Sequence, residues 1–538
     1  MEVYDAVVVG GGIAGLTGAA YLAKAGASVL LLEKNEKCGG LVNSFSRDGF
    51  LFDGGVKALE SAGIILPMLK ELGIDIEIVK SPVSVGIEDT VIHVTSKESV
   101  NEYSDLLKKL YPDSEEDIER VISFIKRIMK DMEVLYGVDN PLFMDFKNNK
   151  SHFARVYFPW LFKFLLTLRR IGKFKMPVEE FLGKIVKNRS LRDIIDQHFF
   201  KNTPTFFAMS YFYLYQDYFY PKGGVGSLAE SVYNKVLEFG GKIETGREVT
   251  EIQAGRKILL DDMGGSYMYN ELVWAADLKR LYSILKTEGL SEATVEKVDT
   301  FRSEISKKHG TDSIFSVFIA VDEPPEAFEE ISNGHFFYTP SRKGLGEIHR
   351  SQLRDLLKNW SGNSKEEVFG WLERFCELDT YEISIPVLKD RNSAPAGKTG
   401  LIISTLLEYE IVKKAHEAGW YSEFKEELQK RIIGVLSNSI YPMLKDKVLF
   451  AFSSSPLSIE RAVGSSEGSI VGWSFEEPIP VVSSMMKVTS SVKTPIPGVL
   501  QAGKWTYSPS GVPMCILTGK LAAAEAIKER KSRENRIR

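Results

Sequence analysis

Three glycines near the N-terminus, Gly10, Gly12 and Gly15, have the spacing of a loop that holds a pyrophosphate. Gly10 permits a tight turn, Gly12 lets the backbone approach the phosphates, and Gly15 allows the following helix to pack on the preceding strand. That helix would direct its free N–H groups and positive dipole end at the negative charge. Ile13 and Ala14, between the glycines, belong to the same predicted dinucleotide site.

The elements that must position this loop follow in the expected order. A continuous apolar run over residues 6–9 predicts a buried parallel strand, and residues 14–25 predict the helix. A second apolar strand over residues 28–32 ends at Glu33, with Lys34 next to it. An acidic side chain at this position accepts hydrogen bonds from ribose hydroxyls. The unit predicts a dinucleotide-binding fold, but the motif alone does not distinguish FAD from NAD(P).

Composition narrows the class of protein. The chain has 538 residues, of which 44% are hydrophobic, so it can form two or more domains with a large core. The formal net charge is −4, which predicts no nucleic-acid partner. The three cysteines, Cys38, Cys376 and Cys515, lie far apart, so we expect neither a metal site nor a disulfide framework. No signal peptide or membrane span is recognisable, which predicts a cytoplasmic location.

Motifs farther along the chain resemble a known family of flavoproteins. Gly39 and Gly40 resemble the second glycine pair of the amine oxidase superfamily, although Leu41 stands where the pattern usually has Arg. Residues 52–55 (Phe-Asp-Gly-Gly) resemble the next family motif. Residues 220–228 are similar to a stretch of phytoene desaturases and carotenoid isomerases. The chain therefore resembles the phytoene desaturase, carotenoid isomerase and retinol saturase-like FAD-dependent oxidoreductases of this superfamily.

The resemblance implies FAD as the cofactor, held without a covalent bond, and it implies further contacts. The backbone at a position like Val249 would meet the adenine, and the strand end at Ala275 would pass the pyrophosphate. Gly503 would lie by the ribityl phosphate. The helix that starts near Val512 and Pro513 would point its N-terminus at the flavin, where its dipole stabilises an anionic reduced flavin.

The resemblance also implies the domain organisation. We expect an α/β fold with a discontinuous, Rossmann-like FAD-binding domain over residues 1–79, 221–290 and 495–538. A mixed α+β substrate-binding domain would occupy residues 80–220 and 291–494.

Within the substrate-binding domain, residues 313–321 and 399–407 predict strands. Residues 100–135 and 421–436 predict helices, and the apolar spacing over residues 115–132 is helical.

The implied function is an FAD-dependent oxidoreductase that desaturates or saturates carbon–carbon double bonds of a hydrophobic polyene or isoprenoid lipid. The alternative within the family is a cis–trans isomerase of a carotenoid-like polyene that uses reduced FAD. The electron donor or acceptor is not identifiable, since no second nucleotide motif is present. No catalytic residue is assigned, because Asp217, Lys222 and His198 are single residues of the kind that usually have structural or surface roles.

Two other classes of protein remain as alternatives. An amine oxidase is one, and a covalent flavin link to Cys515 would favour it. A non-enzymatic prenyl-carrier protein of the same architecture is the other. Such proteins lack the phosphate-binding motif, whereas its residues Gly10, Gly12, Gly15 and Glu33 are all present here.

Three stretches bear on an oily substrate or a membrane. Residues 157–173 are apolar and aromatic with flanking cations, which suits either a helix in a membrane interface or a buried cap over the substrate cavity. Residues 199–220 are dense in Phe and Tyr, which suits an apolar tunnel or ordinary core packing. The basic residues 528–538 indicate a frayed, solvated helix end or, alternatively, attraction to anionic lipid.

Overall fold

A sheet of mainly parallel strands forms the base of the dinucleotide-binding unit. The computed structural model describes residues 2–143 and 157–537, so Met1, residues 144–156 and Arg538 of the predicted domain ranges lie outside it. In the described residues the sheet has the order β10-β2-β1-β13-β12-β11-β14, with β20 also paired to β13. Strands β1 (Val3–Val9) and β20 (Val499–Gln501) each pair in parallel with β13 (Ser266–Trp274). Strand β2 (Val29–Leu32) pairs in parallel with β1, and β10 (Lys242–Glu244) with β2. The predicted α/β fold class with a Rossmann-like FAD-binding domain is confirmed.

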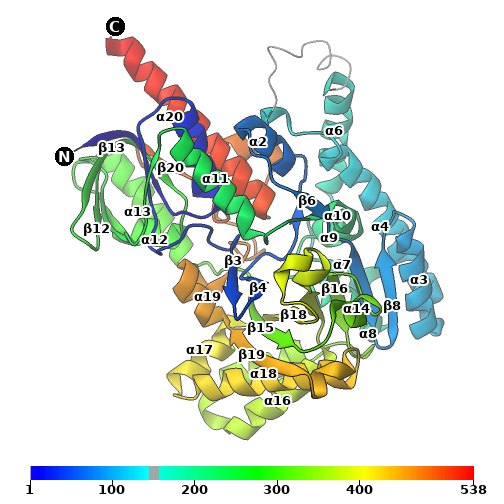
Figure 1. Ribbon diagram of the computed structural model, residues 1–538. Coiled ribbons are helices and arrows are strands. Elements are labelled where there is room, and N and C mark those ends of the chain that lie inside the picture. Colours follow the sequence, from blue (N-terminus) through cyan, green and yellow to red (C-terminus); the bar gives the residue numbers. More distant parts are fainter. Residues whose placement is uncertain (1, 144–156, 538) are drawn as a thin grey trace.

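Both faces of this sheet are covered, which explains the unbroken apolar sequence of its strands. Ala6 and Val8 of β1 face α1 (Ile13–Lys24), which lies between α11 (Gly226–Glu238) and α20 (Val512–Ile537), as Figure 1 shows. Val7 and Val9 face the opposite layer, formed by α12 (Leu278–Ile284) and α13 (Glu292–Ser306). The predicted strand–loop–helix–strand order of residues 3–32 is therefore confirmed.

The antiparallel part of the same unit is formed by β11 (Val249–Gln253) and β12 (Ile258–Asp261), which pairs with β13. Strand β14 (Leu285–Lys286) pairs with β11 in parallel. Helix α13 packs with this unit, because Val298 and Ile305 share its core with Trp274. The domain limits given above remain a proposal.

A second sheet, of seven strands in the described residues, has the order β19-β15-β18-β17-β16-β7-β8. Its strands are β7 (Val83–Ile87), β8 (Thr90–Val94), β15 (Ser313–Val321), β16 (His335–Thr339), β17 (Tyr381–Ser384), β18 (Thr399–Leu407) and β19 (Val448–Ser454). The predicted strands 313–321 and 399–407 are confirmed. Helices α16 (Lys365–Leu378), α17 (Tyr409–Glu417) and α18 (Tyr421–Asn438) cover one face in the lower part of Figure 1.

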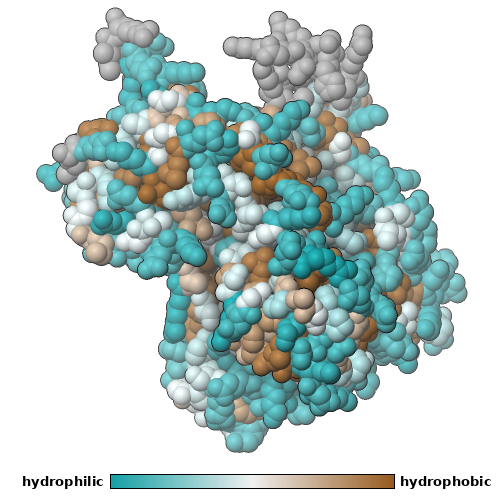
Figure 2. Space-filling view, in the orientation of Figure 1, coloured by the Kyte–Doolittle hydropathy of each residue, from teal (hydrophilic) through white to brown (hydrophobic). Residues whose placement is uncertain are grey.

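A helical layer lies beside the second sheet. It contains α3 (Ser99–Leu110), α4 (Glu115–Tyr136), α6 (Phe158–Ile171), α7 (Val178–Ile185), α8 (Arg189–Asp196), α9 (Thr205–Ala208) and α10 (Tyr211–Asp217). The helices expected within residues 100–135 form, but Pro112 separates them because proline cannot continue a helix interior. The face drawn in Figure 2 is mostly hydrophilic, with separate apolar patches.

Short strands and a hairpin connect the two large sheets. The hairpin consists of β3 (Ser44–Arg47) and β4 (Phe50–Asp53), and the small sheet of β5 (Leu59–Glu60), β9 (Tyr218–Pro221) and β6 (Ile78–Lys80). Asp53 accepts hydrogen bonds from the Tyr220 hydroxyl at 2.8 Å and from the Val225 N–H at 3.0 Å. The two family-like motifs at 52–55 and 220–228 are thus held together by one buried carboxylate.

Candidate active site

One large cavity connects the phosphate loop to the second sheet. It has a volume of about 1360 Å³ and begins at Gly10 and Gly12. Every residue assigned to the cofactor from the sequence lines it except Gly15. Those lining residues are Gly10, Gly12, Ile13, Ala14, Glu33, Lys34, Gly39, Gly40, Leu41, Val249, Ala275, Gly503, Val512 and Pro513.

The phosphate loop has the geometry that its glycines predict. Gly10 has φ +103°, a conformation that side chains other than glycine rarely adopt, and a Cβ there would lie 2.8 Å from the Ala275 carbonyl oxygen. A Cβ on Gly15 would lie 1.9 Å from the Gly10 carbonyl oxygen, so Gly15 permits the close packing of helix and strand instead of lining the cavity. A Cβ on Gly12 would meet no protein atom within 4 Å. The space beside Gly12 is therefore available to a phosphate group.

Glu33 lies at the predicted end of β2 and is buried. Its Oε2 accepts a hydrogen bond from the Gly11 N–H at 2.6 Å, and its Oε1 accepts two from Asn35, at 2.8 and 2.9 Å. A carboxylate has about four acceptor sites, so capacity remains for a ribose hydroxyl. The ribose contact stays a prediction, and the structure adds that Glu33 also holds the phosphate loop.

The second glycine pair extends the loop's wall. The Gly39 N–H donates to the Gly11 carbonyl oxygen at 2.8 Å, and Gly39 and Gly40 have φ of +129° and +59°. On the far side, the Gly503 N–H donates to Thr518 Oγ1 at 3.0 Å, which ties this glycine to α20. Helix α20 begins at Val512, as predicted, and its first turn leaves backbone N–H groups without partners inside the helix. These residues fit the FAD cofactor expected at this site.

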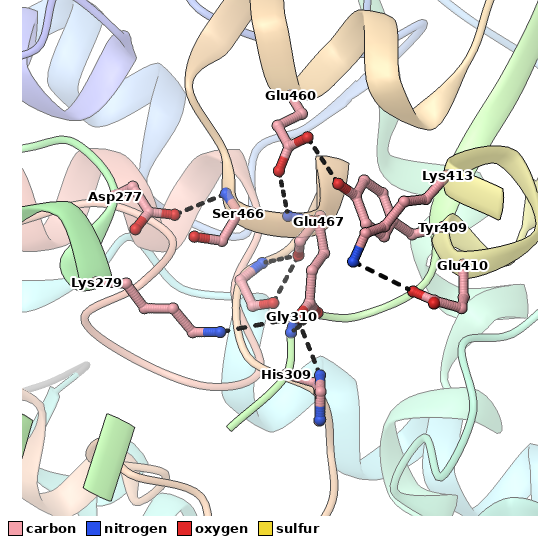
Figure 3. Close-up of polar contacts among 12 residues, drawn as sticks. Asp277, Lys279, His309, Gly310, Tyr409, Glu410, Lys413, Glu460, Ser466 and Glu467 are labelled. Carbon is pink, nitrogen blue, oxygen red and sulfur yellow. Dashed lines mark hydrogen bonds and ion pairs between the residues drawn. The ribbon is translucent and has the colours of Figure 1, made fainter. Parts of the chain in front are cut away.

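Residues 456–468, which we call the closing segment, contribute to one wall of the cavity. They comprise α19 (Pro456–Val463) and the 3₁₀ turn η9 (Ser466–Gly468), and they come from the second unit. Figure 3 shows how Asp277 accepts the Ser466 N–H at 2.8 Å while Glu467 accepts the Gly310 N–H, also at 2.8 Å. Glu460, Gly464 and Ser466 line the cavity near Glu33 and Lys34. The closing segment therefore joins the two units beside the predicted adenosine end.

A group of ionisable side chains in the cavity wall was not found from the sequence. Lys57 Nζ lies 2.9 Å from Glu382 Oε2, and His335 Nε2 lies 3.3 Å from Glu382 Oε1. Burial raises the pKa of Glu382, but Lys57 and His335 outweigh it and hold that pKa below its usual value. Burial lowers the pKa of His335, so its ring is neutral near pH 7. The three residues lie far apart in the sequence, and no local pattern marked them.

Two further residues missed from the sequence line the cavity. Glu60 follows the 52–55 motif by a few positions, and Lys504 follows Gly503 directly. The Lys504 ammonium donates a hydrogen bond to the Ser469 carbonyl oxygen at 2.6 Å, and burial lowers its pKa to about 8. In the sequence, only the closeness of Glu60 and Lys504 to family-like motifs could have indicated that they belong to the site.

Asp217, Lys222 and His198, to which the sequence assigns no catalytic role, lie in three different environments. Asp217 accepts the N–H groups of Ser61 and Ala62 at 2.9 and 3.1 Å, and Lys222 forms an exposed pair with Glu77. His198 lines the cavity among aromatic rings, and burial lowers its pKa to about 4. Asp217 and Lys222 are structural and surface groups, and His198 is a neutral part of the wall.

Some aromatic residues of the stretch 199–220 line the cavity, and others pack in the core, so both proposed roles occur. Phe200, Phe206, Phe207 and Tyr218 line the cavity together with Tyr211. Phe199, Phe212 and Tyr215 instead pack in the core of the helical layer. Some rings of this stretch face the cavity and others face the core, so one stretch supplies both a cavity wall and a core.

Helix α6 is exposed and also reaches the cavity. Phe158 and Phe162 are 74% and 67% exposed, so this end of α6 is not buried as the alternative of a buried cap would require. At its C-terminal half, Leu165, Leu168 and Ile171 line the cavity. Among the described residues, no helix is both long enough and apolar enough to cross a bilayer.

The basic C-terminal stretch is helical as far as Ile537. Arg530 lies 3.5 Å from Asp5, and Arg533 pairs with Glu271. These intramolecular pairs use part of the positive charge that an anionic lipid would otherwise attract.

A dinucleotide-binding loop at one end of a large, mainly apolar cavity between two sheets is the arrangement expected of an oxidoreductase that binds a dinucleotide cofactor. The chain belongs to the flavin-containing amine oxidoreductase family, whose model matches residues 13–527. A flavin held by a dinucleotide-binding loop is FAD, so the predicted cofactor, the superfamily and the class of FAD-dependent oxidoreductase are confirmed.

Similar proteins include enzymes of opposite reaction direction. The chain is 22% identical to the all-trans-retinol 13,14-reductase of Danio rerio over 94% of this chain and 82% of that protein. It is 22% identical to the carotenoid 3,4-desaturase of Haloarcula japonica over 98% of each. The solved cyclohexylamine oxidase of Brevibacterium oxydans shares the fold, with a TM-score of 0.57, 12% identity, and coverage of 98% of this chain and 99% of that one.

The flavin should be released when the protein is denatured, because Cys515 is a poor nucleophile. Cys515 lines the cavity, and burial raises the pKa of its thiol to about 11, against the opposing effects of Ser510 and Lys504. A neutral thiol does not attack readily. We expect all flavin absorbance in the filtrate after denaturation and ultrafiltration. Flavin retained by wild-type protein but lost from the Cys515→Ala variant would contradict this expectation.

Proposed function

We propose that the protein is an FAD-dependent oxidoreductase that adds or removes hydrogen across a carbon–carbon double bond of a hydrophobic polyene or isoprenoid lipid. The observation that carries this proposal is the continuous cavity, which passes from the phosphate loop to a wall of Phe and Tyr side chains. Such a wall binds an extended apolar molecule by burying its surface. The named activities of the retinol reductase and the carotenoid desaturase agree with this substrate class.

Different residues of the site would bind the cofactor and the substrate. Gly12, Glu33 and the first turn of α1 would hold the pyrophosphate and ribose of FAD, and the bound flavin supplies hydride-transfer chemistry. Phe206, Phe207 and Tyr211 would orient the polyene and exclude water from it.

Anaerobic incubation of the FAD-loaded protein with retinoid and carotenoid substrates tests the function. A product heavier or lighter by two hydrogens supports it and gives the reaction direction. A product of unchanged mass and altered geometry would favour the alternative, the reduced-FAD isomerase. Turnover of primary amines with no change in any polyene would overturn the proposal in favour of an amine oxidase.

We further propose that α6 lies on a membrane and opens the cavity to it. The helix exposes Phe158, Phe162 and Leu166, while Arg169 and Lys173 stand at the cavity near its C-terminal end. Exposed aromatic and aliphatic side chains with adjacent cations suit the interface of an anionic bilayer. A polyene held in the bilayer could then reach the cavity without crossing water.

Replacing Phe158 and Phe162 together with serine should weaken vesicle binding by about 100-fold or more, because burial of the two rings together contributes about 3–6 kcal/mol. Cosedimentation with vesicles of phosphatidylcholine and phosphatidylserine measures this effect. The control variant carries serine at Met263 and Leu449, which are 68% and 46% exposed and lie on other elements. Equal binding by the α6 variant and this control would contradict the assignment.

A further inference from the structure

Glu60 carries a carboxyl group that faces the cavity, and no other residue in the described ranges hydrogen-bonds to it. It occupies β5 opposite Tyr218 of β9. Its neighbour Leu59 is fully buried, and strand alternation sends Glu60 to the other side, into the cavity wall. In the described part of the chain, the Glu60 carboxyl accepts a hydrogen bond from its own N–H alone. A carboxyl group in such a position is free to act on a bound molecule.

Glu60 also lies beside the start of α20. Its Oε1 is 3.4 Å from the position that a Cβ on Gly511 would occupy, and Gly511 directly precedes Val512 and Pro513. These residues border the part of the cavity where the flavin is expected. Glu60 is therefore placed at the junction of the expected cofactor and the aromatic chamber that begins at Tyr218 and Tyr211.

The groups around Glu60 favour its protonated form. Burial raises the pKa of Glu60 to about 7, opposed by its own N–H and assisted by the Asp217 carboxylate. The other titratable groups near it are the phenols of Tyr136, Tyr211 and Tyr218, which are uncharged at neutral pH. Among the described residues, no Lys or Arg side chain pairs with Glu60.

Glu382 in the same cavity has the opposite environment. Lys57 and His335 hold its pKa below the usual value, so it remains an anion committed to an ion pair. In many enzymes, two carboxyl groups lie in surroundings that shift their pKa values in opposite directions, and this difference identifies which of the two carries the proton. Here that comparison selects Glu60 as the proton carrier and Glu382 as a fixed negative charge.

We propose that Glu60 exchanges a proton with the polyene substrate at the carbon next to the one that exchanges hydride. The inference rests on the proposed function. In saturation, the Glu60 O–H bond breaks, and the electron pair of the double bond forms a C–H bond with the released proton. The hydride brings its own electron pair and forms the C–H bond at the neighbouring carbon. In desaturation, loss of hydride leaves a cation, the adjacent C–H bond breaks, its electron pair forms the double bond, and Glu60 takes the proton. Solvent then restores the starting form of Glu60.

The test compares Glu60→Gln with wild type, with Glu60→Asp as the conservative variant and Glu77→Gln as the exposed control. We expect Glu60→Gln to lower kcat by about 100-fold or more, as removal of a general acid or base does, with FAD content unchanged. Glu60→Asp should recover part of the rate. The wild-type rate should titrate near pH 7, falling as pH rises for saturation and as pH falls for desaturation. Glu60→Gln should lose this dependence.

An infrared readout of the FAD-loaded protein is independent of turnover. Wild type should show a protonated-carboxyl carbonyl band that disappears as the pH rises through about 7, and Glu60→Gln should lack it. If wild type converts polyenes while Glu60→Gln retains full rate or an unchanged pH profile, the proton assignment alone is wrong. Absence of the band also overturns it. If wild type converts no polyene, the proposed function is wrong, and the proton assignment falls with it.

Discussion

Replacing Gly12 with alanine should leave the protein folded and weaken its FAD affinity by about 10- to 100-fold. An added Cβ meets no protein atom within 4 Å, and Gly12 has φ −69°, which alanine adopts without strain. The methyl group would instead occupy the space proposed for the pyrophosphate. Loss of one hydrogen bond to a charged group costs about 1.5–3 kcal/mol, which corresponds to this change in affinity. Titration of the apoprotein with FAD, followed by flavin fluorescence, measures it.

Two other glycines separate a cofactor effect from a folding effect. Gly15→Ala should destabilise the protein itself, because its Cβ would lie 1.9 Å from the Gly10 carbonyl oxygen. Gly370→Ala in α16 is the matched control, since its Cβ would meet nothing within 4 Å and the site is far from the loop in sequence. An unchanged FAD affinity in Gly12→Ala would show that the pyrophosphate lies elsewhere.

Replacing Lys57 with methionine should destabilise the protein by about 2–3 kcal/mol at neutral pH. Removing one partner of a fully buried ion pair costs about 3–5 kcal/mol. The cost here is smaller because, although Lys57 is only 3% exposed, the Glu382 side chain is 32% exposed. Urea unfolding followed by tryptophan fluorescence measures the effect. Lys222→Met, which removes the exposed pair with Glu77, should leave the stability nearly unchanged.

The pH dependence and a double variant identify the ion pair as the cause. The pKa of Glu382 lies below its usual value of 4.5 in the folded protein, so its contribution is present above that pH and declines as the pH falls below it. The difference between wild type and Lys57→Met should therefore narrow in acid. Adding Glu382→Leu to Lys57→Met should restore part of the stability by removing the unpaired charge. A pH-independent difference would indicate lost packing and not a lost ion pair.

The sequence alone determined the dinucleotide unit and the elements around it. The tight turn at Gly10 and the helix–strand contact at Gly15 are local requirements, and the apolar runs of β1 and β2 are local as well. Each is set by neighbouring residues, so each can be read along the chain. The strands at 313–321 and 399–407 were predictable as well, and the start of α20 at Val512 followed from the family resemblance.

Only the tertiary structure decided which polar groups meet in the cavity. Lys57, Glu382 and His335 come from separate strands and loops. The second sheet places β16 beside β17, which brings His335 close to Glu382, and Lys57 reaches Glu382 from a different part of the chain. Glu60 became a candidate once its partnerless carboxyl was seen in the cavity wall. The aromatic stretch likewise divided between wall and core only when the helices were packed. Long-range packing and burial set these charges and contacts, and no short stretch of sequence encodes them.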